Sequence, residues 1–139
     1  MPNLPMRRLA LLAALAMATL PIPSQAFEVT QQRGLASYYH HKFTGRTMAN
    51  GDRFNPNSNT AAHRTLPFGT VVEVTNLRNG ESRIVVITDR GPFIRGRIID
   101  VSPRIAEELG MRRAGVAEVM VRPVGQIDTY EEVAEASAR

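Results

Sequence analysis

Short stretches in which apolar and polar residues alternate run through most of the chain. In 70–75, Val72 and Val74 fall on one face and polar side chains on the other, and this period of two is typical of a half-buried strand. Segment 82–88 is apolar on both faces, which predicts burial on both sides, as inside a barrel. Further strands are predicted at 32–39, 97–101 and 116–123.

Turn-forming residues separate these stretches about every ten residues, which predicts a small closed β structure of about five or six strands. Asn79-Gly80 predicts a tight hairpin between two of the strands. One short helix is predicted after 97–101, because Ser102 can cap its start, Pro103 suits its first turn and Gly110 ends it.

The long polar segment 40–59 lacks any such pattern. A loop of this length is either disordered or functional. The pair Asn50-Gly51 favours a functional loop, because it can turn the chain tightly and present Asp52. The next segment, 60–69, is predicted to be compact and closed by its Pro and Gly residues.

The N-terminus has the features of an export signal. An apolar run at 9–20 follows two arginines, and 24–26 offers the small residues that a signal peptidase reads. We therefore predict a signal peptide at 1–26, cleaved after Ala26. The run is too short to span a bilayer comfortably, and the chain has no cysteine to carry a lipid anchor. The mature protein is expected to be periplasmic or secreted, without a stable membrane anchor.

The remainder divides into one domain at 27–125 and an acidic tail at 126–139. The whole chain has 17 Lys and Arg against 13 Asp and Glu, and the domain holds 14 of these bases and 9 of the acids. All but one of the domain's bases are arginine, which suits planar contacts with carboxylates and phosphates, so an anionic polymer is the predicted partner. Export argues against nucleic acid and favours cell-wall glycan. Without cysteine, the domain has to fold without disulfides.

Two of the predicted strands lead into a carboxylate, at Asp89 and at Asp100. The loop between them is rich in Gly and Pro and carries Arg90, Arg95 and Arg97. Polar groups placed where a strand stops lie at the rim of a rigid scaffold, where binding and catalytic residues are common. Asp89 alone is better explained as a turn residue that accepts nearby backbone amides, but the whole stretch is not.

Several separate motifs occur along the chain in one order and spacing. They lie at 34–39, 49–54, 60–70, 74–77 with 79–80, 89–93, 96–102 and 109–111. Together they resemble the rare lipoprotein A (RlpA) family, and the similarity covers about 34–124, nearly all of the predicted mature chain. Any one of these motifs alone is a weak signal, whereas their combination is specific.

The resemblance implies a mainly β fold, a six-stranded double-psi β-barrel with one short α-helix, as in expansins. It also implies a lytic transglycosylase that cleaves the β-1,4 bond after N-acetylmuramic acid in peptide-free peptidoglycan glycan strands and leaves a 1,6-anhydro end. Neither a metal nor a cofactor is implied. The implied process is cell-wall remodelling and daughter-cell separation, with divisome proteins as candidate partners, and we expect a monomer.

The family's functional positions fall on Asp52, His63, Asp89 and Asp100, which are therefore the candidate catalytic residues. A lytic transglycosylase needs one carboxyl group that acts first as acid and then as base; we assign this role to Asp89, with Asp100 as the competing candidate. A second carboxylate nearby would keep the first one protonated near neutral pH. Asp52 and His63 would orient the substrate or tune that proton.

Contacts with the substrate are expected from five residues. Tyr39 and Asn50 would bind the glycan, and Arg90, Arg95 and Arg97 would hold its lactyl carboxylates.

Structural explanations compete with several of these roles. His63 can brace the loop that follows it, Asp100 can cap the helix, and Tyr38 and Tyr39 can pack rather than stack on sugar. Asp52 can be a turn residue; it also stands where the family commonly has Glu, so its carboxyl group is one methylene shorter. This departure keeps a second hypothesis open, a non-catalytic wall-binding or wall-loosening module.

Overall fold

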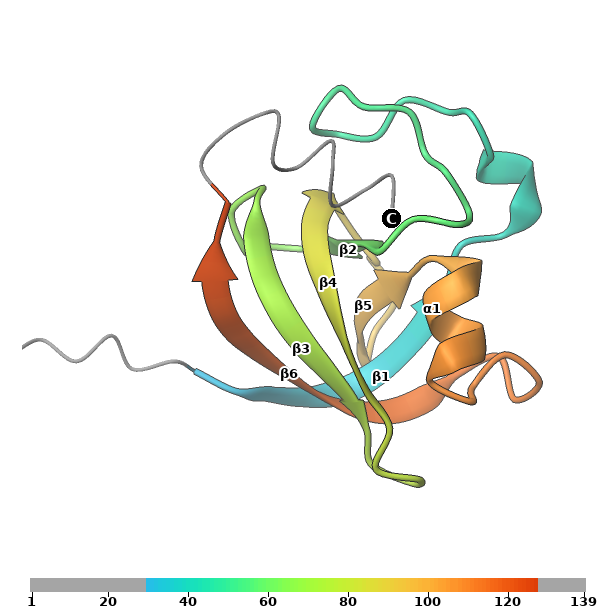
Figure 1. The fold of residues 1–139 in the computed structure, drawn as a ribbon, viewed down its shortest axis with the longest axis vertical. Helices are drawn as coiled ribbons and strands as arrows, with labels where there is room; N and C mark the ends of the chain where they lie inside the picture. The colour runs from blue at the N-terminus through green and yellow to red at the C-terminus, as the bar shows by residue number, and fades with distance from the viewer. Residues whose placement is uncertain (1–29, 128–139) are drawn as a thin grey trace, which may run out of the picture.

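Within residues 30–127, which the computed structural model describes, six strands close into one barrel. Around the barrel the strands follow the order β1-β5-β2-β4-β3-β6 (Figure 1). The elements along the chain are β1 (Gln32–Tyr38), the 3-10 helix η1 (His41–Phe43), β2 (Thr60–His63), β3 (Thr70–Asn76), β4 (Ser82–Asp89), β5 (Arg97–Val101), α1 (Pro103–Glu108) and β6 (Ala117–Gln126). For this part of the chain, the predicted mainly β barrel of six strands with one short α-helix is confirmed.

The strand register brings two candidate carboxylates together. β2 lies between β4, to which it is parallel, and β5, to which it is antiparallel. Ala62 of β2 is paired with Asp89 on one side and with Asp100 on the other. Because neighbouring strands lie about 4.8 Å apart, the α-carbons of these two aspartates are about 10 Å apart.

The inward faces of the strands fill the barrel. Val72 and Val74 of β3 are fully buried, as their alternation predicts. β4 is buried on both faces from Val85 to Thr88, but Ile84 is 46% exposed because it is paired with Glu73 on the outer face of the barrel. The prediction of two-sided burial is therefore confirmed for the second half of this strand and wrong for the first half.

Two strands differ from the prediction. β2 falls in the segment predicted only as compact: its four residues are small or polar and all are buried, so they show no alternation that would mark a strand. β6 continues to Gln126, beyond the predicted end at Pro123. The register against β3 shifts between Val71 and Val72, and this irregularity lets the pairing continue past the proline.

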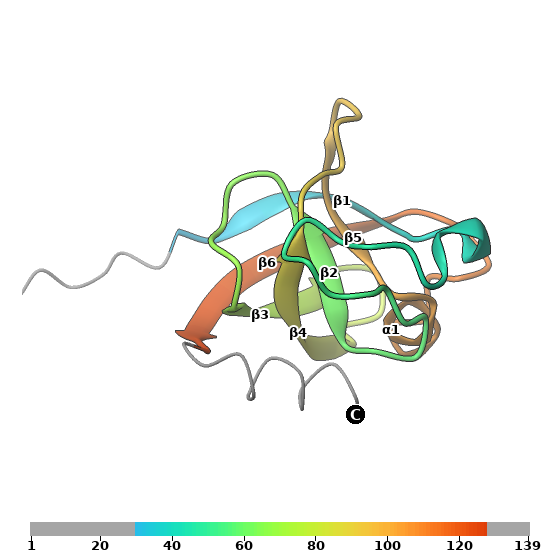
Figure 2. The same ribbon diagram turned by 90° about the horizontal axis from the view of Figure 1, so that it is seen from above.

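The helix and the hairpin form as predicted. The Ser102 hydroxyl accepts a hydrogen bond from the amide of Ile105, and Pro103 occupies the first turn of α1. Gly80 has a φ of 76° in the hairpin between β3 and β4, a conformation that glycine adopts at little cost. Two loops project from the barrel: 39–59 extends beyond its upper end in Figure 1, and 90–96 stands out between β4 and β5 in Figure 2.

Residues 1–29 and 128–139 lie outside the described residues, and with them the predicted signal peptide and nearly all of the predicted tail. Among residues 30–127, no helix is long and apolar enough to cross a lipid bilayer.

Candidate active site

A groove of about 400 Å³ lies where the two projecting loops meet the ends of the strands. Residues from both loops line it, including Phe43 and Phe54 from the first and Phe93 from the second. Five of the residues predicted for the site line the same groove: Tyr39, Asp89, Arg90, Arg97 and Asp100. The strand register explains why the two aspartates share it, because residues paired across neighbouring strands point to the same side of a sheet.

Asp89, the last residue of β4, is held by three hydrogen bonds. Its Oδ2 accepts from the Tyr39 hydroxyl at 2.6 Å. Its Oδ1 accepts from two backbone amides, that of Ala49 at 2.8 Å and that of Arg90 at 2.9 Å. The bond from the Arg90 amide fits the explanation of Asp89 as a turn residue that accepts nearby backbone amides. The contacts to Tyr39 and Ala49 also fasten the long loop 39–59 to the end of β4, so Asp89 is an anchor for that loop.

Asp100 has a different environment in the same groove. Its side chain is 14% exposed and pairs with the guanidinium of Arg97. Burial raises the pKa of Asp100 above its usual value; Arg97 opposes this shift, and the charge of Asp89 adds to it. The helix-cap alternative for Asp100 is not what the structure contains, because Ser102 provides the cap of α1.

The adjacent tyrosines divide into one that packs and one that faces the groove. The Tyr38 hydroxyl donates to the carbonyl of Arg112, and its ring packs against the core. Tyr39 lines the groove and makes an edge-to-face contact with Phe54, with ring centroids 4.4 Å apart. Burial, followed by the bond to Asp89, raises the pKa of Tyr39 far above its usual value, so the phenol remains a hydrogen-bond donor.

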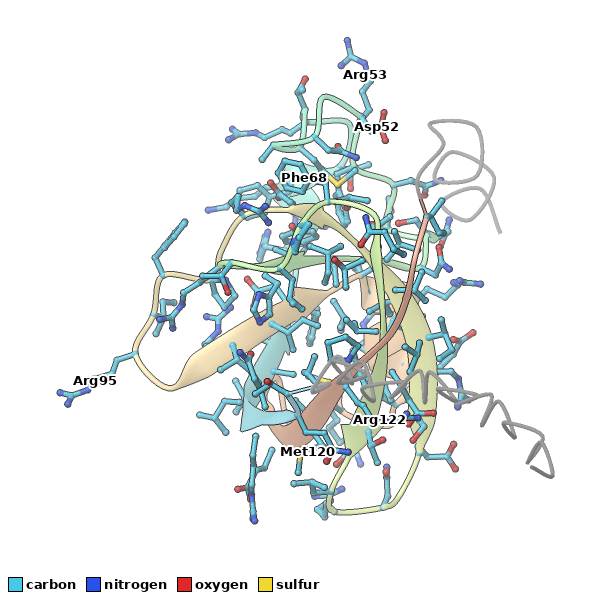
Figure 3. The ribbon with its side chains drawn as sticks, turned by 90° about the vertical axis from the view of Figure 1, so that its left-hand side faces the viewer. Asp52, Arg53, Phe68, Arg95, Met120 and Arg122 are labelled. Carbon is cyan, nitrogen blue, oxygen red and sulfur yellow. The ribbon has the colours of Figure 1, made fainter. Side chains whose placement is uncertain are left out.

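Arg90 and Arg95 of the second loop, and Arg97 at the start of β5, have separate roles. Arg90 donates to the carbonyls of His63 and Leu66, at 3.2 and 2.8 Å, and its guanidinium lies 3.9 Å from the centre of the Phe68 ring. It therefore braces the turn after β2. Arg95 is exposed at the tip of loop 90–96 and points away from the barrel (Figure 3). Arg97 is the one of the three that both lines the groove and pairs with a candidate acid.

His63 lies outside the lining of the groove, in a neighbouring hollow with Gln32. Its Nδ1 accepts from the amides of Thr65 and Leu66, both at 3.1 Å. Its Nε2 therefore carries the proton and donates to Gln32 Oε1 at 2.8 Å. Burial lowers the pKa of His63, and the nearby arginines lower it further. These contacts match the alternative in which His63 braces the loop that follows it.

Asn50 and Asp52 form a turn at the outer end of the first loop. The Asn50 side chain accepts from the Asp52 amide at 3.0 Å and donates to the Asp52 carboxylate at 2.9 Å. The Asn50 amide donates to Thr88, which ties this turn to β4. Figure 3 shows Asp52 at one extremity of the molecule and Arg95 at another. Neither Asn50 nor Asp52 is part of the groove lining, so their predicted roles stay predictions.

Two residues that shape the groove, Arg64 and Phe93, are not among the site residues predicted from the sequence. Arg64 donates two hydrogen bonds to backbone carbonyls of the second loop and one to the carbonyl of Arg97 in β5, and Phe93 is the most exposed large apolar residue among those described. Arg64 lies in the 60–70 motif and Phe93 in the 89–93 motif, and this membership was the available signal. Within residues 30–127, no group of three or more His, Cys, Asp or Glu side chains is placed to hold a metal ion.

Comparison with known proteins gives a consistent family. The model of the lytic transglycolase family matches residues 31–121. A protein of Synechocystis sp. named probable endolytic peptidoglycan transglycosylase RlpA is 52% identical over 79% of this chain and 35% of its own length. The endolytic peptidoglycan transglycosylase RlpA of Pasteurella multocida is 49% identical over 76% of this chain and 35% of its own length. The chain thus spans about a third of the length of these curated relatives.

Solved structures support the fold. The Streptomyces papain inhibitor superposes with a TM-score of 0.55 at 24% identity, over 70% of this chain and 98% of that one. An expansin of Clavibacter michiganensis superposes with a TM-score of 0.55 at 20% identity, over 72% of this chain and 53% of its own. At these identities the likeness concerns the double-psi β-barrel alone.

Proposed function

Because this chain belongs to the lytic transglycolase family, we propose that it is an exported lytic transglycosylase that acts on the glycan strands of peptidoglycan. The bond cleaved is the β-1,4 bond that follows N-acetylmuramic acid, and the substrate is glycan without stem peptides. The observation that carries this proposal is the groove in which Asp89 and Asp100 flank Ala62, with the pKa of Asp100 raised by burial.

Of the two aspartates, we assign the role of proton donor to Asp100. A general acid has to hold a proton before the reaction, and the raised pKa of Asp100 favours that protonated form. Asp89 accepts three hydrogen bonds, an arrangement that suits a carboxylate acting as an anchor. This assignment reverses the order expected from the sequence, in which Asp89 was the first candidate and Asp100 the second.

The reaction needs one carboxyl group and no water. Asp100 donates its proton to the glycosidic oxygen as the bond from that oxygen to C1 of N-acetylmuramic acid breaks. The 6-hydroxyl of the same sugar then forms a bond to C1, and its proton passes to the Asp100 carboxylate. The products are an anhydro-ended strand and a strand with a free 4-hydroxyl, and the enzyme recovers its starting protonation state.

The remaining groove residues position the substrate. Tyr39, held by Asp89, contributes its aromatic ring to the groove lining. Arg97 can hold a lactyl carboxylate of the substrate while it remains next to Asp100. Arg90 is engaged with backbone carbonyls and contributes by fixing the end of β2 rather than by gripping substrate.

Digestion of peptide-free sacculi by the purified protein tests the proposal. Mass spectrometry should find peptide-free glycan fragments that end in 1,6-anhydro-N-acetylmuramic acid. These fragments are lighter by one water than those that lysozyme releases from the same material. Fragments with ordinary reducing ends would show a hydrolase instead.

A non-catalytic wall-binding module is the second candidate. It is favoured by Asp52, which is shorter than the common Glu of the family and lies outside the groove lining. Binding to sacculi without release of any fragment would select this candidate over the enzyme.

A further inference from the structure

The loop between β4 and β5 exposes apolar surface next to the groove. Phe93 is 79% exposed and Ile94 is 55% exposed, and both belong to the groove lining. The Phe93 ring lies beside the backbone of Gly91, where an added β-carbon would come within 3.6 Å of the ring. Exposed apolar groups gathered at a binding groove mark a contact surface for a ligand more often than a folding requirement.

Arg64, the residue directly after β2, holds this loop in place. Its Nε donates to the carbonyl of Pro92 at 2.7 Å, and its Nη2 donates to those of Ile94 and Arg97 at 3.1 and 2.6 Å. The amide of Arg97 also donates to the Ile94 carbonyl at 3.1 Å, which closes the base of the loop. A planar guanidinium that bonds several carbonyls at once restricts the loop more than one ammonium would. The exposed ring is therefore presented on a fixed support.

The chemistry of the surface fits an uncharged face of a sugar ring. Aromatic rings offer large apolar area at little conformational cost, and the axial C–H groups of a pyranose present an apolar face to such a ring. Arg97 and Asp100, two of the charged residues in the same lining, are where the reacting bond is proposed to bind. A glycan strand long enough to reach the reacting position would extend past the second loop.

We propose that Phe93 is a platform for a pyranose ring of the glycan strand, adjacent to the reacting sugars, and that Arg64 is the positioning residue that fixes it. This inference rests on the proposed function for the identity of the polymer. Neither residue takes part in proton transfer, so their contribution is to binding and to the placement of the strand.

The chain contains no tryptophan, which makes a direct test possible. Phe93→Trp introduces a single fluorescent reporter that preserves an aromatic ring at the tip, and Ile84→Trp places the same reporter at an exposed site outside the groove lining. Soluble peptide-free glycan strands are the titrant. We expect a saturable change in emission for Phe93→Trp and no change for Ile84→Trp. An unresponsive Phe93→Trp variant, or equal responses from the two variants, would overturn the platform.

Binding without cleavage is measured by pelleting the protein with peptide-free sacculi. Phe93→Ala should weaken binding about fivefold to tenfold, whereas Ile84→Ala should bind as the unsubstituted protein does. Because Phe93 is mostly exposed, its truncation should leave the fold intact. In a digestion assay the same variant should raise KM and leave kcat nearly unchanged. Unchanged pelleting of Phe93→Ala would refute the proposal.

The role of Arg64 has its own readout. Arg64→Lys keeps the charge but cannot bond three carbonyls with the same geometry. The amides of 93–95 should therefore exchange faster with solvent deuterium, and sacculus binding should weaken, as in Phe93→Ala. Normal exchange with weakened binding would instead place Arg64 in direct contact with the strand and remove its positioning role. If the unsubstituted protein binds sacculi through Phe93 but releases no anhydro ends, the proposed function fails and this inference stands.

Discussion

Asp89 and Asp100 flank the same residue of β2 and line the same groove, yet their surroundings give them different chemistry. Asp89 ends β4 and accepts a phenol and two backbone amides. Asp100 lies within β5, is largely buried, and has one charged partner, Arg97. Hydrogen-bond donors on both oxygens suit an anchor, whereas burial with a raised pKa suits a carboxyl group that has to hold a proton.

If Asp100 is the proton carrier, as we propose, then a position after an apolar run does not by itself make an acid catalytic. Both aspartates come at the end of an apolar run in the sequence, and only their neighbours in space distinguish them. The neighbours of Asp89 come from a loop forty residues earlier, through Ala49, and from Tyr39 before it. Substitutions of three residues test this comparison: Asp100, the proposed proton carrier; Asp89, the anchor; and the buried His63.

Replacing the proposed proton carrier should have the largest effect. Asp100→Asn keeps the shape of the side chain and its place beside Arg97 but has no acidic proton, so the rate of release of anhydro ends from peptide-free sacculi should fall by about 10²–10⁴-fold. Circular dichroism should show an unchanged fold.

Asp100→Glu is the matched control, because it keeps a carboxyl group and should retain more activity than Asp100→Asn. Activity of Asp100→Asn close to that of the unsubstituted protein would return the acid role to Asp89, the first candidate of the sequence prediction.

Replacing the anchor, Asp89, should lower activity less than replacing Asp100 does, and it should loosen the first loop. Asp89→Ala removes three accepted hydrogen bonds, and we expect a loss of about 1–3 kcal/mol in the free energy of unfolding. The Ala49 amide should exchange faster with deuterium. Activity should fall by about tenfold to a hundredfold, because Tyr39 and the first loop would no longer be held in place.

Asp89→Asn separates the two possible roles of this residue. Its amide oxygen can still accept from Ala49 and Arg90, so an anchor should largely survive the change, whereas a proton carrier would not. If Asp89→Asn lost as much activity as Asp100→Asn, with Ala49 exchange unchanged, the division of roles proposed for the two aspartates would be wrong.

Much of the fold follows from local patterns in the sequence. Alternation in 70–75 and the Asn79-Gly80 turn identify β3 and its hairpin because the period of a strand and the conformation of a tight turn depend on neighbouring residues along the chain. β2 could not be found in this way, since its burial on every residue comes from pairing with both β4 and β5. The closure of the barrel depends on that strand.

The candidate site shows the same limit. The apolar runs before Asp89 and Asp100 predicted that both lie at the rim of the scaffold, but their meeting across Ala62 requires β2. The difference between predicted and observed arginine roles has a similar cause. Arg90 is engaged by the carbonyl of His63 and the ring of Phe68, and Arg95 points outward; nothing adjacent in the sequence distinguishes either of them from Arg97.

His63 extends the comparison, because burial acts on it and on Asp100 in opposite directions. Burial favours the neutral form of both, raising the pKa of Asp100 and lowering that of His63. The stability contributed by Asp100 is therefore lost as pH rises through its raised pKa. The stability contributed by His63 is present above its usual pKa of 6.5 and is lost as pH falls below that value toward the lowered one.

We accordingly expect His63→Gln to change the pH dependence of stability, the smallest of the three effects. In the unsubstituted protein the midpoint of thermal unfolding should fall between about pH 7.5 and about pH 5 as His63 is forced to take up a proton and gives up its bonds to the amides of Thr65 and Leu66. His63→Gln cannot titrate, so the fall should be shallower, whatever its stability at pH 7.5. His41→Gln, at an exposed histidine, is the control and should leave the slope as it was. An equal slope in all three proteins would mean that protonation of His63 costs the folded protein no stability, which would contradict the bracing role inferred from its bonds to Thr65 and Leu66.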